Sequence, residues 1–137
     1  MVEIHARYEG ELHCEATHGP SNAVLHTDAP VDNHGRGRSF SPTDLVGTAL
    51  GTCMVTIMGI AAERHGWDIR GTRVRVVKHM CADPVRRIER LEVEITVPGE
   101  HDERARDLLR KAASGCPVWA SLHPDVTVEL TLAFGSD

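Results

Sequence analysis

The sequence lacks the charge pattern of a nucleic-acid-binding protein. Its 137 residues include 15 Lys and Arg against 20 Asp and Glu, giving a net charge of −5. The basic residues are scattered among acids, whereas a nucleic-acid binder needs a positive stripe to displace counterions from phosphates. We therefore expect no DNA or RNA partner.

A secretory leader is also missing from the start of the sequence. The first twenty residues alternate apolar and polar side chains, with no basic segment followed by an apolar one. We therefore expect a cytoplasmic protein. The four cysteines include no Cys-x-x-Cys pair. In a cytoplasmic chain they are better explained as buried thiols with one reactive pair than as a disulfide framework.

The composition, 41% hydrophobic and 26% charged, is that of one globular domain spanning residues 1–137. Alternation of apolar and polar residues and turn-forming residues predict strands over 2–9, 11–18, 23–27, 69–79, 88–97 and 126–134. Helical signals cover 41–65, 102–114 and a short segment, 116–122. The order βββ-α-ββ-α-β has no regular βα repeat, which favours an α+β fold with antiparallel sheets.

The first predicted helix has strong start and stop signals. Ser41-Pro42-Thr43-Asp44 places a capping Ser before Pro at the first helical position, and Gly66 ends the helix. No charged residue occurs between Leu45 and Ala62, as in a membrane span. Because this stretch is single, rich in Gly and Thr and flanked by strands, we expect a central buried helix and no membrane. So short a chain rarely buries such a helix alone, so we also expect a homodimer.

Two cysteines lie at positions suited to chemistry. Cys53 follows Gly47 and Gly51 within the uncharged helix, and interior glycines indicate close approach of another group to that face. A single cysteine in an apolar helix is more often an inert buried side chain. Cys116 precedes Pro117 at a predicted N-cap, where the helix N-terminus favours a thiolate.

Two segments carry a resemblance to a known family. SPTDL (41–45), followed by Ala49 and Cys53, and GCPV (115–118) resemble the two cysteine motifs of the OsmC/Ohr family of osmotically inducible and organic-hydroperoxide-resistance proteins. The predicted order of elements also matches that family over nearly the whole chain. The resemblance implies an intertwined homodimer with active sites at the subunit interface.

The same resemblance implies a thiol-dependent peroxidase. Cys53 matches the peroxidatic cysteine and Cys116 the resolving one, so a hydroperoxide would oxidise Cys53 to a sulfenic acid that condenses with Cys116. An external dithiol would reset the pair, and no cofactor would be needed. The alternative is a redox-sensing or apolar-ligand-binding module on the same fold.

The groups that activate the thiol in this family are not in their usual places. Many members have Glu ten residues before the first cysteine, where this chain has Thr43, and an Arg in the N-terminal hairpin that is absent here. Arg36 and Arg38, in the loop before the helix, are candidate replacements that could pair with Asp44. The alternative for both arginines is an ordinary solvated charge.

The other residues with reactive side chains have simpler explanations. The nine histidines include groups near cysteines, such as His13 with Cys14 and His79 with Cys81, but none has zinc-finger spacing. We therefore expect no metal, and interpret Cys14 and Cys81 as structural thiols. Trp119, three residues after Cys116, is a candidate wall of a substrate pocket.

Overall fold

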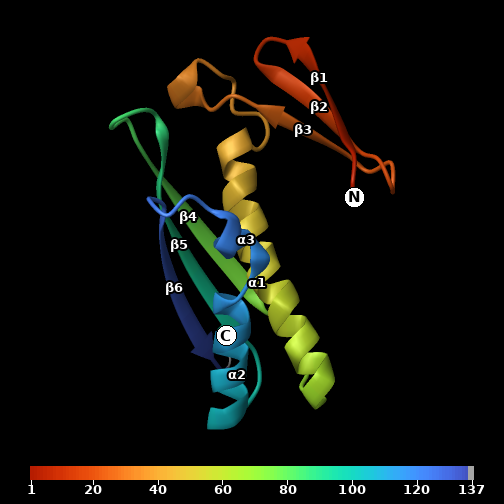
Figure 1. Ribbon diagram of the computed structural model, residues 1–137, viewed down its shortest axis with the longest axis vertical. Helices are drawn as coiled ribbons and strands as arrows, with labels where there is room; N and C mark the ends of the chain where they lie inside the picture. Colours follow the sequence, from red (N-terminus) through yellow and green to blue (C-terminus); the bar gives the residue numbers. More distant parts are fainter. Residues whose placement is uncertain (136–137) are drawn as a thin grey trace. The chain divides into compact units, whose positions relative to one another are not determined.

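The computed structural model describes residues 1–135 (Figure 1). Its elements divide between two compact units, Met1–Val46 and Gly47–Asp137, and the division falls within the long helix. In chain order the elements are β1 (Ile4–Gly10), β2 (His13–His18), β3 (Val24–Asp28), the 3-10 helix η1 (Val31–Asn33), α1 (Pro42–His65), β4 (Arg73–Cys81), β5 (Arg87–Val97), α2 (Glu103–Ser114), α3 (Pro117–Ser121) and β6 (Thr127–Phe134). Every predicted element is present.

The first unit is the expected three-stranded meander. Both strand pairs, β1 with β2 and β2 with β3, are antiparallel. The first turn uses Gly10, Glu11 and Leu12, all three with positive φ. None of the buried apolar side chains of the described chain belongs to residues 1–46, and the only fully buried side chains of this unit are the polar Asp28 and Ser41.

Helix α1 begins and ends where the sequence predicts. The Ser41 hydroxyl accepts a hydrogen bond from the Asp44 amide at 3.1 Å, and the Asp44 carboxylate accepts one from the Ser41 amide at 2.9 Å. This reciprocal capping box satisfies two amides of the first turn. At the other end Gly66 has φ of +70°, the left-handed conformation that terminates helices.

The core of the second unit lies between one sheet face and two helices. Side chains four residues apart along α1 and α2 meet alternate residues of β5, as the periods of helix and strand require. The core consists of Leu50, Met54, Met58, Ala62, Leu91, Val93, Ile95, Val97, Leu109, Ala113 and Cys116. Figure 1 shows α1 and α2 on the same side of the β4-β5-β6 sheet.

The interior glycines of α1 do mark a close approach, and its partner is strand β4. A Cβ at Gly51 would lie 2.8 Å from Val76 and 3.0 Å from Val74, and one at Gly47 would lie 3.4 Å from Val76. Valine is stiff about χ1, so these side chains cannot easily move away. Glycine therefore sets the distance between α1 and the sheet.

One strand pair differs from the antiparallel arrangement that we expected. Strands β4 and β5 form the predicted antiparallel hairpin, but β6 pairs with β5 in parallel, from Arg90 opposite Thr127 to Val97 opposite Phe134. A parallel pair needs a crossover connection, and α2 with α3 supplies it. The order of elements therefore contained one βαβ unit that we had not recognised, and the sheet of this α+β fold is mixed.

The apolar character of α1 is confirmed, although only one face of it is buried. By length and composition alone the helix could cross a membrane, but core helices of other proteins give the same weak indication. Of its most apolar stretch of 18 residues, 33% is buried. The buried residues repeat along one side, whereas Ile60 on another side is 43% exposed. An uncovered face of this kind is what the predicted dimer would use.

Candidate functional site: the Cys53 and Cys116 thiols

Cys53 lies in the middle of α1, beside the buried face of the helix. Its neighbours Leu50 and Met54 are fully buried, and the Cys53 side chain packs against the same core while remaining partly accessible. A thiol that is supported by packing yet reached by solvent can meet a small electrophile. The same placement holds the sulfur on a rigid element.

Cys116 is placed by the break between two helices. Helix α2 ends at Ser114 with Gly115 as its C-cap, and Cys116 takes an extended conformation as the N-cap of α3, with Pro117 at the next position. The Cys116 Sγ accepts a hydrogen bond from the Trp119 amide at 3.3 Å. The side chain is fully buried in the core.

The pKa of the Cys116 thiol is raised, contrary to our expectation of a thiolate at this N-cap. Burial is the largest cause, because it disfavours the charged form. The neighbouring Cys53 raises the pKa further, through a shared hydrogen bond and repulsion between two thiolates, whereas the Trp119 and Val118 amides lower it. Desolvation therefore outweighs the short helix N-terminus, and Cys116 keeps its proton.

The two thiols differ in ways that suit different tasks. One is partly exposed on a long helix, the other is buried and protonated, and they are close enough to influence each other. All four cysteines are free thiols in this structure. A pair of this kind can cycle between dithiol and disulfide.

Four of the remaining predicted site residues belong to the first unit: Arg36, Arg38, Thr43 and Asp44. Arg38 donates to the Asp28 carboxylate from its backbone amide at 2.9 Å and from its Nε at 3.0 Å. Arg36 forms an exposed ion pair with Glu11 at 3.1 Å. Asp44 is the partner of Ser41 in the capping box, and the Thr43 hydroxyl lies 3.2 Å from that of Ser41. An activating role of either arginine toward Cys53 stays a prediction.

The structure also shows where Trp119 and the two other cysteines, Cys14 and Cys81, lie. Trp119 is part of the core layer next to Cys116, and its role in a substrate pocket stays a prediction. Cys81 lies 3.7 Å from the Asp83 carbonyl oxygen, at the turn between β4 and β5. Neither Cys14 nor Cys81 joins the buried core.

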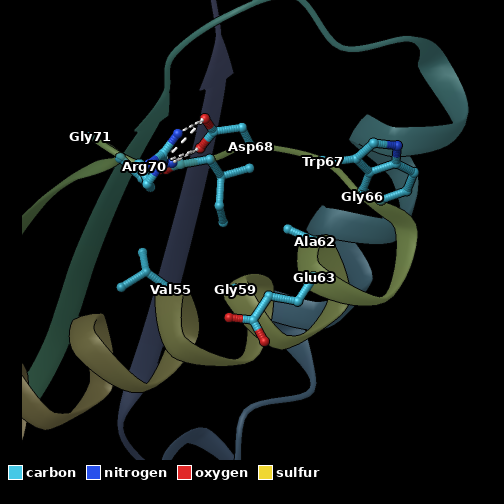
Figure 2. Close-up of a pocket in the computed structure, with 11 residues that line it drawn as sticks. Val55, Gly59, Ala62, Glu63, Gly66, Trp67, Asp68, Arg70 and Gly71 are labelled. Carbon is cyan, nitrogen blue, oxygen red and sulfur yellow. Dashed lines mark hydrogen bonds and ion pairs between the residues drawn. The ribbon is translucent and has the colours of Figure 1, made fainter.

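Sequence reasoning missed two features. The first is Asp28, a buried carboxylate at the end of β3 that no sequence motif marks. The second is an open groove of about 600 Å³ at the C-terminal end of α1 (Figure 2), whose lining includes Val55, Trp67 and Ile69. Neither Cys53 nor Cys116 lines the groove. The ion pair of Asp68 and Arg70 at 2.6 Å borders it.

Fold and thiols together define a class: two-cysteine α+β proteins in which a long apolar helix carries one thiol and a helix N-terminus the other. The profile of the family described as OsmC-like protein matches residues 35–131, and the chain belongs to this family. This range contains both cysteines. A search of curated proteins finds no match.

Solved structures show the same fold. One, from Psychrobacter arcticus, provisionally described as an osmotic stress induced and detoxification response protein, is 42% identical with a TM-score of 0.91, and each chain covers 96% of the other. The organic hydroperoxide resistance protein OsmC of Legionella pneumophila is 16% identical with a TM-score of 0.78, covering 97% of this chain and 96% of its own. OhrB of Bacillus subtilis is 17% identical with a TM-score of 0.71, at 96% and 97% coverage.

Proposed function

We propose that this protein is a thiol-dependent hydroperoxide reductase in which Cys53 is the peroxidatic and Cys116 the resolving cysteine. The observation that carries the proposal is the asymmetry of the pair: a partly accessible Cys53 beside a buried, protonated Cys116. Family membership and the hydroperoxide-resistance names of structural neighbours support it.

In the first step the Cys53 thiolate attacks the distal oxygen of ROOH. An S–O bond forms, the O–O bond breaks, and the leaving alkoxide takes a proton from water to become ROH. Cys53 is left as a sulfenic acid and the peroxide is reduced by two electrons. The core packing of Cys53 holds its sulfur in place during this attack.

In the second step the Cys116 sulfur attacks the sulfur of the sulfenic acid. The S–S bond forms as the S–O bond breaks, and the hydroxyl leaves as water with the proton of the Cys116 thiol. An external dithiol then reduces the disulfide by exchange and is itself oxidised. Burial raises the pKa of Cys116, so the proton that leaves with the hydroxyl is that of the Cys116 thiol itself. No cofactor takes part in these steps.

Single cysteine variants test the two roles. We expect Cys53→Ser to abolish peroxide reduction, because a hydroxyl is a much weaker nucleophile than a thiolate. Cys116→Ser should complete one turnover, leaving a Cys53 sulfenic acid that a dimedone probe traps. Cys81→Ser is the matched control and should behave as the parent. Peptide mass analysis after one equivalent of cumene hydroperoxide or of hydrogen peroxide provides the measurement.

The parent chain should give a Cys53–Cys116 disulfide. A disulfide through Cys14 or Cys81, or no oxidation by either peroxide, would contradict the proposal. The binding-module alternative would then take its place, supported by the open groove that Val55, Trp67 and Ile69 help to line. Titration with an apolar fluorophore while following Trp67 emission would test that alternative.

We further propose that the working form is a homodimer with active sites at the subunit interface. The first unit leaves its large apolar side chains exposed, among them Ile4, Tyr8, Val24 and Phe40, at 53% or more each. A second copy would cover such surfaces. Sedimentation at micromolar concentration should show a species of twice 15.0 kDa, and a 15.0 kDa species alone would contradict the dimer.

A further inference from the structure

The first unit contains a histidine whose ring is oriented by a buried carboxylate. His13 of β2 lies directly opposite Asp28 of β3 in the strand register. Its Nδ1 is 3.2 Å from Oδ1 of Asp28, whose side chain is fully buried. Arg38 donates to the same carboxylate from its backbone amide at 2.9 Å and from its Nε at 3.0 Å. A carboxylate held by an arginine is an acceptor, so Nδ1 of His13 is placed to donate to it.

This arrangement turns the other ring nitrogen of His13 into a ligand. When Nδ1 donates to Asp28, Nε2 is the nitrogen that can present a lone pair. Metal-binding histidines in proteins commonly donate their second nitrogen to a carboxylate, which fixes the ring and raises the basicity of the ligating nitrogen. The Asp28–His13 pair already has this form.

Two further potential metal ligands, His26 and Glu9, lie close to Nε2 of His13. His26 shares a sheet face with Asp28, two residues earlier on β3, and its Nδ1 lies 3.2 Å from Nε2 of His13. This contact is a hydrogen bond in the structure, and the two rings stack with centroids 5.2 Å apart and planes that differ by 19°. A bound ion would take the place of that hydrogen bond. Two nitrogen ligands of one tetrahedral Zn²⁺ ion lie roughly 3.3 Å apart, given Zn–N bonds of about 2.0–2.1 Å. The pair already has this separation.

The third donor is positioned by a β-bulge. In the β1–β2 register Tyr8 pairs with Cys14 and Gly10 with His13, which leaves Glu9 as the extra residue. Bulges redirect side chains, and here Oε1 of Glu9 lies 4.0 Å from Nε2 of His13. The other oxygen, Oε2, pairs with Arg7 at 3.3 Å, so one carboxylate oxygen faces the histidines.

We propose that Glu9, His13 and His26 form a binding site for a divalent transition-metal ion. Their ligand atoms lie within 4.8 Å of one another, and they come from three different strands. Two imidazoles and one carboxylate are a set that Zn²⁺, Ni²⁺ and Cu²⁺ accept, with water in the remaining position. The proposal replaces our expectation of no metal, because the ligands are brought together by cross-strand register and not by sequence spacing.

The site would stabilise the part of the molecule that has no apolar core of its own. A metal that binds only the folded sheet adds stability in proportion to the logarithm of its concentration over Kd. The ion would link β1, β2 and β3 beside the contacts that Asp28 makes with His13 and Arg38. Both cysteines of the thiol pair lie in the second unit, so the pair supplies no ligand to this site.

Zinc titration tests the site in the full-length protein after chelator treatment under reducing conditions. Competition with a chromophoric chelator should show one Zn²⁺ per chain with a micromolar or lower Kd. Loss of a group that only supports a ligand weakens metal binding by about 10- to 100-fold. Loss of the ligand itself in His26→Gln should therefore weaken binding by at least about 100-fold, and Glu9→Gln, which keeps one oxygen, by roughly 10-fold. His18→Gln, on the same sheet, is the matched control and should bind as the parent.

Thiols also bind zinc, so the titration is repeated in the Cys53→Ser variant, which should retain the site. NMR of the histidine rings provides a second readout: zinc should shift Nε2 of His13 and Nδ1 of His26. His26 is exposed, so its replacement should leave the fold intact by circular dichroism. No binding at micromolar zinc, equal binding by the parent and His26→Gln, or loss of binding in Cys53→Ser would overturn the proposal.

Discussion

Different interactions stabilise the interior of each of the two units of this protein. Residues 47–135 bury eleven apolar side chains in one core, whereas residues 1–46 bury only Asp28 and Ser41. The first unit is therefore organised by polar contacts and leaves its apolar side chains at the surface. A three-stranded sheet without a packed face is marginal in water. The thiol pair is therefore held by an apolar core within its own unit, whereas the N-terminal sheet needs stabilising contacts from outside its own apolar side chains.

The largest expected difference between the units concerns leucine truncation. Leu109→Ala removes a fully buried side chain of α2 and should lower the free energy of unfolding by about 2–5 kcal/mol. Leu25→Ala, on β3, removes a side chain that is 44% exposed and should cost under about 0.5 kcal/mol. Urea unfolding followed by circular dichroism measures both. Equal losses would contradict the comparison.

The glycines of α1 allow a sharper test within one helix. Gly51→Ala should destabilise by about 1–3 kcal/mol, because the new Cβ would meet Val76 at 2.8 Å and Val74 at 3.0 Å. Gly59→Ala meets nothing within 4 Å and should stabilise by about 0.5–1 kcal/mol through helix propensity. Thermal unfolding of the two variants should shift in opposite directions. A shift in the same direction would mean that α1 does not approach β4 through Gly51.

Acid should weaken the first unit through Asp28. The folded pKa of this carboxyl lies below its unfolded value, mainly because Arg38 donates to it. Its contribution is therefore complete above about pH 4 and is lost as the pH falls further. Amide exchange of β3 should accelerate more below pH 4 in the parent than in Asp28→Asn, which carries no titrating group there. Glu3→Gln, at an exposed side chain of the same unit, should behave as the parent.

Alkali should weaken the second unit, with the smallest effect of the series. The Cys116 thiol has a raised pKa in the fold, so its stabilisation is complete below the unfolded cysteine pKa of about 8.5 and is lost as pH rises. Urea unfolding between pH 7 and pH 10 under reducing conditions should therefore fall more steeply for the parent than for Cys116→Ala. Parallel pH curves for the two proteins would show that Cys116 does not stay protonated in the fold.

Local signals predicted most of the fold. The capping box at Ser41 and Asp44, the stop at Gly66 and the alternation of β5 act within a few residues of the chain, so the boundaries of α1 and the β4–β5 hairpin followed from them. The parallel pairing of β6 did not follow. It depends on where the α2–α3 crossover returns the chain, and alternation alone does not distinguish the direction of a neighbouring strand.

The candidate sites show the same limit. The two cysteines were found from their motifs, but the protonated state of Cys116 was not, because desolvation depends on everything packed around the sulfur. Asp28 and the cluster of Glu9, His13 and His26 have no sequence signature, since the register of three strands and one bulge brings them together.

The sequence by itself determined the α+β class, the helix that carries Cys53 and the N-cap position of Cys116, because capping, periodicity and turn chemistry are local. Only the tertiary structure decided which thiol is buried, which carboxylate is fully enclosed and which strands run parallel. These properties depend on residues far apart in the chain, whose distances are set by packing and strand register.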